Sequence, residues 1–97
     1  MINEISTADL HARLDAGENI MLLDVRQPEE YAEQHIPNSL LIPLGELPDR
    51  VDELEDYRDK EIVVICRSGN RSGQACMFLT MSGFENVVNM RGGMLSW

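Results

Sequence analysis

The 97-residue chain lacks several features that define whole classes of protein. It has only two cysteines, Cys66 and Cys76, with no CxxC pair and no Cys/His cluster of zinc-finger spacing. Neither a disulfide framework nor a metal site is therefore expected. No apolar run approaches the ~20 residues that a membrane-spanning helix needs. The chain does not open on a basic segment followed by an apolar one, so we expect no signal peptide and a cytoplasmic location.

Basic residues are also scarce. The 8 Lys plus Arg stand against 17 Asp plus Glu, which gives a formal net charge of −9. Residues 1–60 hold 15 acidic and 5 basic residues, whereas residues 61–97 hold 2 and 3. Nucleic acids and anionic membrane surfaces both require a basic footprint, so neither is an expected partner. The last third of the chain, which carries Arg67 and Arg71, can still receive a small anion.

Two apolar runs, Ile20–Val25 and Ile62–Ile65, are typical of strands that are buried on both faces of a parallel sheet. Further short strands are expected at residues 40–42 and 87–88. Helical patterns alternate with these strands, at residues 6–17, 28–34, 46–57 and 72–82. The alternation predicts one α/β domain over residues 1–97, with a central parallel sheet of about five short strands and helices on both faces.

Residues 65–73 combine a thiol with several groups that stabilise anions. Cys66 follows directly after a predicted strand, and a short loop with two glycines leads into a helix. Sites in parallel sheets form at the carboxyl ends of strands. A helix start offers unpaired N–H groups, and Arg67 and Arg71 add positive charge, so a thiolate is favoured. The alternative is a structural cysteine in the core.

The sequence Cys66-Arg67-Ser68-Gly69-Asn70-Arg71-Ser72 resembles the active-site loop of the rhodanese family. Three further groups of residues resemble other motifs of that family and occur in its order. They are Leu23-Asp24-Val25-Arg26 with Glu30-Tyr31, His35-Ile36-Pro37-Asn38-Ser39 with Ile42-Pro43, and Met90-Arg91-Gly92-Gly93-Met94 with Trp97. The resemblance covers nearly the whole chain and implies a single rhodanese-like domain.

The resemblance implies a sulfurtransferase. Cys66 would carry a sulfane sulfur as a persulfide, without a cofactor or metal. The sulfur would come from an anionic donor such as thiosulfate and pass to cyanide, an acceptor thiol or a protein. The implied binding residues are Arg67, Ser68, Gly69, Asn70, Arg71 and Ser72. Their backbone amides would surround the outer sulfur, and one of the two arginines would receive the donor.

The chain departs from the family pattern at three places. Gln34 stands where the family often has Gly, and Asn38-Ser39 stands where it often has Gly-Ala. Asparagine tolerates positive φ better than most residues, so the second change is compatible with the same turn. The family commonly continues beyond the position of Trp97, which leaves open a truncated C-terminal segment.

Other polar and sulfur-containing residues receive structural interpretations. We expect Asp24 and Arg26 to form a buried or half-buried ion pair, with a catalytic pair as the alternative. His35 is expected to hydrogen-bond the backbone or Asp24, with a proton shuttle as the alternative. Cys76 is expected in the core rather than as a resolving thiol. The methionines at positions 77, 81, 90 and 94 are expected to fill gaps in the core or around the loop.

Three other functions remain open. A cysteine phosphatase also holds a thiolate at a helix start, but its signature has five residues between Cys and Arg, whereas four separate Cys66 from Arg71. A binding or regulatory module of the same fold is the second alternative. The third is a persulfide relay that accepts sulfur from one protein and passes it to another.

Overall fold

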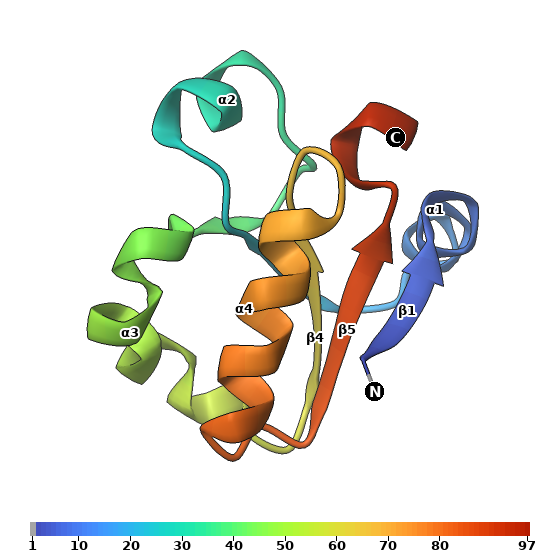
Figure 1. The fold of residues 1–97 in the computed structure, drawn as a ribbon. Helices are drawn as coiled ribbons and strands as arrows, with labels where there is room; N and C mark the ends of the chain where they lie inside the picture. The colour runs from blue at the N-terminus through green and yellow to red at the C-terminus, as the bar shows by residue number, and fades with distance from the viewer. Residues whose placement is uncertain (1) are drawn as a thin grey trace.

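Five parallel strands form the centre of the computed structural model, which describes residues 2–97 (Figure 1). Their order across the sheet is β1-β5-β4-β2-β3. The strands are β1 (Asn3–Ser6), β2 (Met21–Asp24), β3 (Leu40–Leu41), β4 (Glu61–Ile65) and β5 (Asn86–Arg91). β4, whose four β-branched residues are buried, lies in the middle, so its carboxyl end opens onto the centre of the sheet edge.

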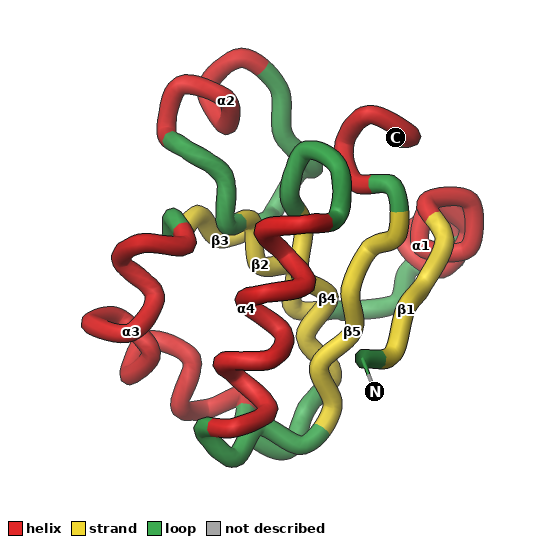
Figure 2. The backbone as a smooth tube through the Cα atoms, in the orientation of Figure 1, coloured by secondary structure: helices red, strands yellow, loops and turns green. Residues whose placement is uncertain are grey.

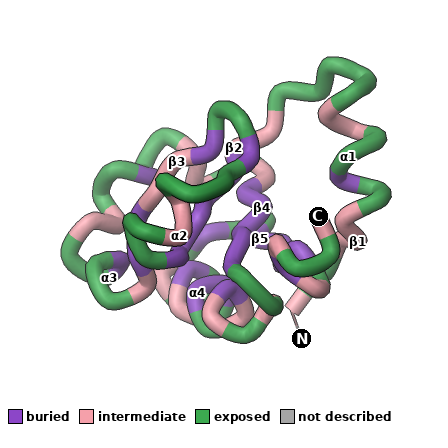
Figure 3. The backbone as a smooth tube through the Cα atoms, turned by 90° about the horizontal axis from the view of Figure 1, so that it is seen from above, coloured by how far each residue is buried: buried purple, intermediate pink, exposed green. Residues whose placement is uncertain are grey.

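Helices cover both faces of the sheet, as Figures 1 and 2 show. They are α1 (Thr7–Asp15), α2 (Pro28–Glu33), α3 (Leu47–Arg50) and α4 (Asn70–Met81). One core cluster, which includes Leu23, Val64 and Leu79, lies between the sheet and α3 and α4. A second cluster, which includes Leu10 and Met90, lies beneath α1. The predicted α/β fold with helices on both faces is confirmed, and Figure 3 shows the buried residues gathered along β4 and the inner side of α4.

The predicted helix over residues 46–57 is wrong in its type. The structure has a short α3 and then a 3₁₀ helix over Val51–Tyr57. A 3₁₀ helix has three residues per turn, so Val51, Leu54 and Tyr57 lie on one face and pack against the core.

The methionine prediction holds for one half of the set only. Met90 is fully buried and Met94 packs against the cluster beneath α1. Met77 and Met81 are 56% and 85% exposed, so they do not fill the core. One side of α4 packs against the sheet and the other faces solvent. Met77 and Met81 both lie on the solvent side.

A buried ion pair fixes the segment that follows β2. Arg26 Nη2 lies 2.8 Å from Asp24 Oδ2, and the same guanidinium donates to the Gln34 carbonyl at 2.6 Å. Both side chains are almost fully buried, and a buried charge is tolerated when it is paired in this way. The predicted ion pair is confirmed, and it ties the end of β2 to the chain after α2.

Two predictions for the following loop are also confirmed. The His35 ring nitrogen Nδ1 lies 2.8 Å from the Tyr31 carbonyl, so His35 contacts the backbone. Asn38 has a φ of +69°, the left-handed conformation that asparagine tolerates. Among residues 2–97, no helix has the length and apolar character needed to cross a membrane.

Candidate functional site

Cys66 is the first residue after β4 and lies at the carboxyl edge of the sheet. Its side chain is fully buried. Three residues later Gly69 takes a φ of +104°, a conformation that glycine adopts readily, and caps the start of α4. The chain therefore turns back around the sulfur within four residues, and the first amides of α4 face it.

Two groups contact the sulfur directly. The Gly69 N–H donates to Cys66 Sγ at 2.9 Å, and the Ser72 hydroxyl oxygen lies 3.2 Å from it. Burial alone raises the pKa of the thiol, because the anion loses its hydration. In the thiolate state, hydrogen bonds to the sulfur from the Ser72 hydroxyl and from the N–H groups of Ser72, Gly69 and Ser68 outweigh this effect and hold the pKa below its ordinary value.

A 3₁₀ turn near the end of the chain, Gly93–Ser96, binds two backbone carbonyl groups of the loop. The Met94 N–H donates to the Cys66 carbonyl at 2.8 Å, and the Leu95 N–H donates to the Arg67 carbonyl at 3.0 Å. A Cβ at Gly93 would overlap these two carbonyl groups, so only glycine allows the turn to approach this closely. With the carbonyls held outward, the amides of the loop are free to face the sulfur.

Asn89, on the neighbouring strand β5, completes the surroundings of the sulfur. Its Oδ1 accepts from the Ser72 hydroxyl at 2.5 Å, and its Nδ2 donates to the Gly69 carbonyl at 3.2 Å. The residue is only 6% exposed. Sequence reasoning missed it, although a polar residue between the apolar Val88 and Met90 in a buried strand was an available signal.

The two arginines of the loop have different surroundings. Arg71 makes a bidentate ion pair with Glu30 of α2, at 2.7 and 2.9 Å, and this pair lowers the pKa of Glu30 to about 2. Arg67 is exposed, and no carboxylate within residues 2–97 lies in ion-pair distance of its guanidinium. It borders a hollow of about 260 Å³, which Glu30 and Glu33 also line.

The structure therefore brings together only part of the predicted set. Cys66, Gly69 and Ser72 contact one another, whereas the side chains of Arg67, Ser68 and Asn70 are exposed. A larger hollow of about 520 Å³ lies between α1 and the loop at residues 36–38. None of residues 66–72 line it, so we centre the candidate site on Cys66.

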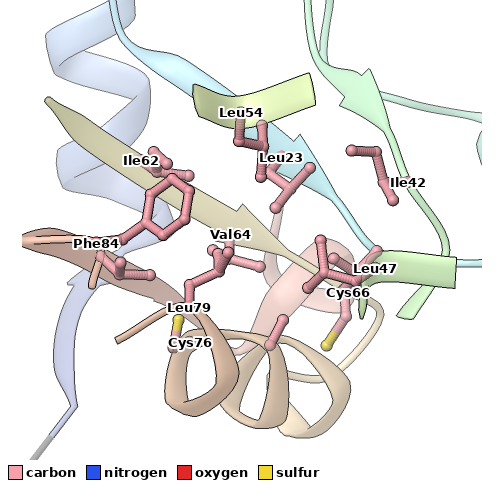
Figure 4. Packing of buried hydrophobic residues seen from close by; sticks show 13 residues of the cluster. Leu23, Ile42, Leu47, Leu54, Ile62, Val64, Cys66, Cys76, Leu79 and Phe84 are labelled. Carbon is pink, nitrogen blue, oxygen red and sulfur yellow. The ribbon is translucent and has the colours of Figure 1, made fainter. Parts of the chain in front are cut away.

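Cys76 belongs to the core, as predicted. It is fully buried on α4, and Figure 4 shows its sulfur well separated from that of Cys66. Burial raises the pKa of the Cys76 thiol to about 12, because the thiolate loses its hydration, and repulsion from the Cys66 sulfur acts in the same direction. The two thiols thus differ in the direction of their pKa shifts.

The opposite shifts predict separate titrations. In a Cys76→Ser variant, the ultraviolet absorbance of the thiolate should appear with a midpoint below the ordinary value of about 8.5. In a Cys66→Ser variant, it should stay absent up to about pH 10, because the remaining thiol is buried without donors. Equal midpoints in the two variants would show that the loop does not tune Cys66.

Comparison with known proteins identifies the family. Residues 6–97 match the rhodanese-like domain. The chain is 41% identical to a sulfurtransferase of Allochromatium vinosum over 100% of its own length and 89% of that protein. It is 42% identical to a rhodanese-related protein of Thermoplasma volcanium, with a TM-score of 0.85 over 98% of this chain and 89% of that one. The human single-domain sulfurtransferase TSTD1 is 28% identical, with a TM-score of 0.83 over 100% of this chain and 96% of that one. Sequence and fold together show that the chain belongs to the rhodanese-like domain family, a family of sulfur-transferring proteins.

Proposed function

We propose that the protein transfers a sulfane sulfur from an anionic donor to a thiophilic acceptor through a persulfide on Cys66. The observation that carries this proposal is the set of donors around one buried sulfur. The Gly69 amide and the Ser72 hydroxyl contact Sγ, and the thiol has a lowered pKa. A thiolate and a terminal persulfide are both sulfur anions, so the loop amides that stabilise the first also suit the second.

With thiosulfate as donor, the Cys66 thiolate attacks the outer sulfur. A new S–S bond forms as the bond to the sulfonate sulfur breaks, and its electron pair leaves with sulfite. The outer sulfur of the persulfide then carries the negative charge. An acceptor such as cyanide attacks this sulfur, the S–S bond breaks, and its electron pair returns to Cys66 as thiocyanate leaves. No redox partner is required.

Because Cys66 is fully buried, the loop has to move to admit a donor. Ser68 and Asn70, on either side of Gly69, are exposed, so the loop that turns around the sulfur is itself at the surface. Local opening of a short surface loop costs far less free energy than global unfolding. Cys76, in the middle of α4, has no such route, which supports assigning the chemistry to Cys66 alone.

The two arginines take different roles in this proposal. The guanidinium of Arg71 is occupied by Glu30, and it joins α2 to the start of α4. Arg67 pairs with no carboxylate among residues 2–97 and is exposed beside the hollow, so it receives the sulfonate oxygens of the donor. The occupied arginine also disfavours a phosphatase, which needs a free guanidinium for the phosphate oxygens.

A persulfide relay is the second candidate. Glu30 and Glu33 line the hollow beside Arg67, and the net charge of the chain is −9. Both oppose the approach of a dianion such as thiosulfate. A neutral or protein-bound persulfide meets no such repulsion, so it is the favoured donor if Arg67 has no influence on thiosulfate.

Incubation with thiosulfate should add one sulfur, about 32 Da, to the intact protein, and cyanide should remove it. The addition follows from the anion-stabilising contacts of Cys66, so the Cys76→Ser variant should gain the same mass. A Cys66→Ser variant that still gains a sulfur would show that the carrier lies elsewhere.

Replacement of Arg67 by alanine should raise KM for thiosulfate and leave kcat nearly unchanged, because the amides around Cys66 remain. Since the side chain of Arg67 is exposed, water and salt screen its charge, so the rise in KM should be modest and should shrink as the salt concentration increases. Steady-state kinetics at two salt concentrations measures both parameters.

Arg50→Ala is the matched control, because it removes the same charge from the last residue of α3 and should leave KM unchanged. An unchanged KM in Arg67→Ala would remove Arg67 from donor binding and would favour the relay.

A further inference from the structure

The donor and acceptor in each hydrogen bond near Cys66 can be assigned from the side-chain amide of Asn89. The Gly69 carbonyl can only accept, so the Asn89 amide must turn its NH₂ group toward it, at 3.2 Å. The amide oxygen then faces Ser72, at 2.5 Å, and this oxygen can also only accept. Ser72 has a single hydroxyl proton, which therefore lies between Ser72 and Asn89.

Ser72 consequently presents a lone pair to the sulfur. In the neutral thiol, the S–H of Cys66 donates to Ser72 Oγ across 3.2 Å, and the chain of donors runs from Cys66 through Ser72 to Asn89. When Cys66 ionises, two acceptors face each other across that distance. The repulsion is relieved only if the Ser72 proton turns from Asn89 to Sγ, which leaves the buried Asn89 oxygen without a donor.

When Cys66 carries a persulfide, the Ser72 proton does not have to turn from Asn89 to Sγ. In the persulfide, Sγ is bonded to two atoms and the negative charge lies on the outer sulfur. The Ser72 proton can then stay on Asn89, while the loop amides face the charge. The free thiolate is the one state of the cycle in which the bond between Ser72 and Asn89 must break.

We propose that Asn89 is a positioning residue for sulfur transfer, which holds the Ser72 proton away from Sγ and so favours the thiol and the loaded persulfide over the free thiolate. The effect on the persulfide rests on the proposed function, whereas the effect on the thiolate does not. Asn89 thereby makes Cys66 retain its sulfur until an acceptor attacks.

The ionisable groups near Cys66 are engaged in ion pairs or too weakly acidic to take part, apart from Arg67, whose side chain is exposed to solvent. Arg71 on α4 pairs with Glu30 on α2, and Arg26 pairs with Asp24 at the end of β2. Cys76 on α4 has a pKa of about 12. A substitution at Asn89 leaves these groups in place, so a changed titration of Cys66 reports on the two partners of Asn89, Ser72 and the Gly69 carbonyl, which the Ser72→Ala background separates.

The test compares the thiolate absorbance of the Asn89→Leu variant with that of the wild type as pH rises. Leucine is close to asparagine in shape, excludes water and cannot accept a hydrogen bond, so Ser72 can donate to the sulfur without competition. The midpoint should fall by about one pH unit. At a pH above both midpoints, the equilibrium constant for transfer of sulfur from thiosulfate to Cys66, with release of sulfite, should be about ten-fold lower in the variant than in the wild type. Intact mass measures the loaded fraction of each protein.

Four further variants decide how Asn89 acts. Asn86→Ala removes an exposed asparagine from the same strand and should change nothing. Ser72→Ala should raise the midpoint, and adding Asn89→Leu to it should have no further effect. Asn89→Ala removes the same acceptor with a smaller side chain, and it replaces Asn89→Leu if that variant does not fold.

A midpoint that stays constant or rises in the Asn89 variants would overturn the proposal, since a merely loosened loop also moves the thiol toward its ordinary pKa. An equal shift in the Ser72→Ala background would show that Asn89 does not act through Ser72. If the wild type takes up no sulfur at all, the proposed function fails, while the titration still decides the role of Asn89.

Discussion

The orientation of the peptide groups around Cys66 is the constraint on which the candidate site depends. A chain that leaves a strand and enters a helix within four residues can face a sulfur with its amides only if its carbonyls are held elsewhere. The turn at residues 93–95 provides this hold, because its N–H groups bind the carbonyls of Cys66 and Arg67. Gly69 and Gly93 make the arrangement possible, the first through its positive φ and the second through its missing side chain.

Charged side chains hold the elements around this site in place, but they are not the groups that stabilise the sulfur anion. The pair Asp24–Arg26 anchors the end of β2, and the pair Glu30–Arg71 joins α2 to α4. The groups that lower the pKa of Cys66 are amides and a hydroxyl, which keep their partial charges at any pH and at any salt concentration. A strongly acidic chain can therefore hold a sulfur anion, since the donors that contact the sulfur are neutral dipoles at close range.

The sequence predicted those features that depend on local patterns. The run Ile62–Ile65 and the Cys66 loop are both where the pattern indicated, because consecutive β-branched residues and closely spaced glycines act over a few residues. β1 escaped prediction, since an edge strand with exposed Asn3 and Glu4 has no apolar signal and forms through pairing with β5. Asn89 and the pairing of Arg71 also depend on residues distant in the sequence, which no local pattern encodes.

The central claim is that the loop amides hold the sulfur anion, and the amide resonances of the loop test it most directly. Two-dimensional nitrogen–proton NMR spectra before and after thiosulfate treatment report on each N–H group. The account predicts downfield proton shifts for Ser68, Gly69 and Ser72 on loading, reversal with cyanide, and no shifts in Cys66→Ser. Shifts confined to other parts of the chain, with these three resonances unchanged in a protein that has gained a sulfur, would contradict it.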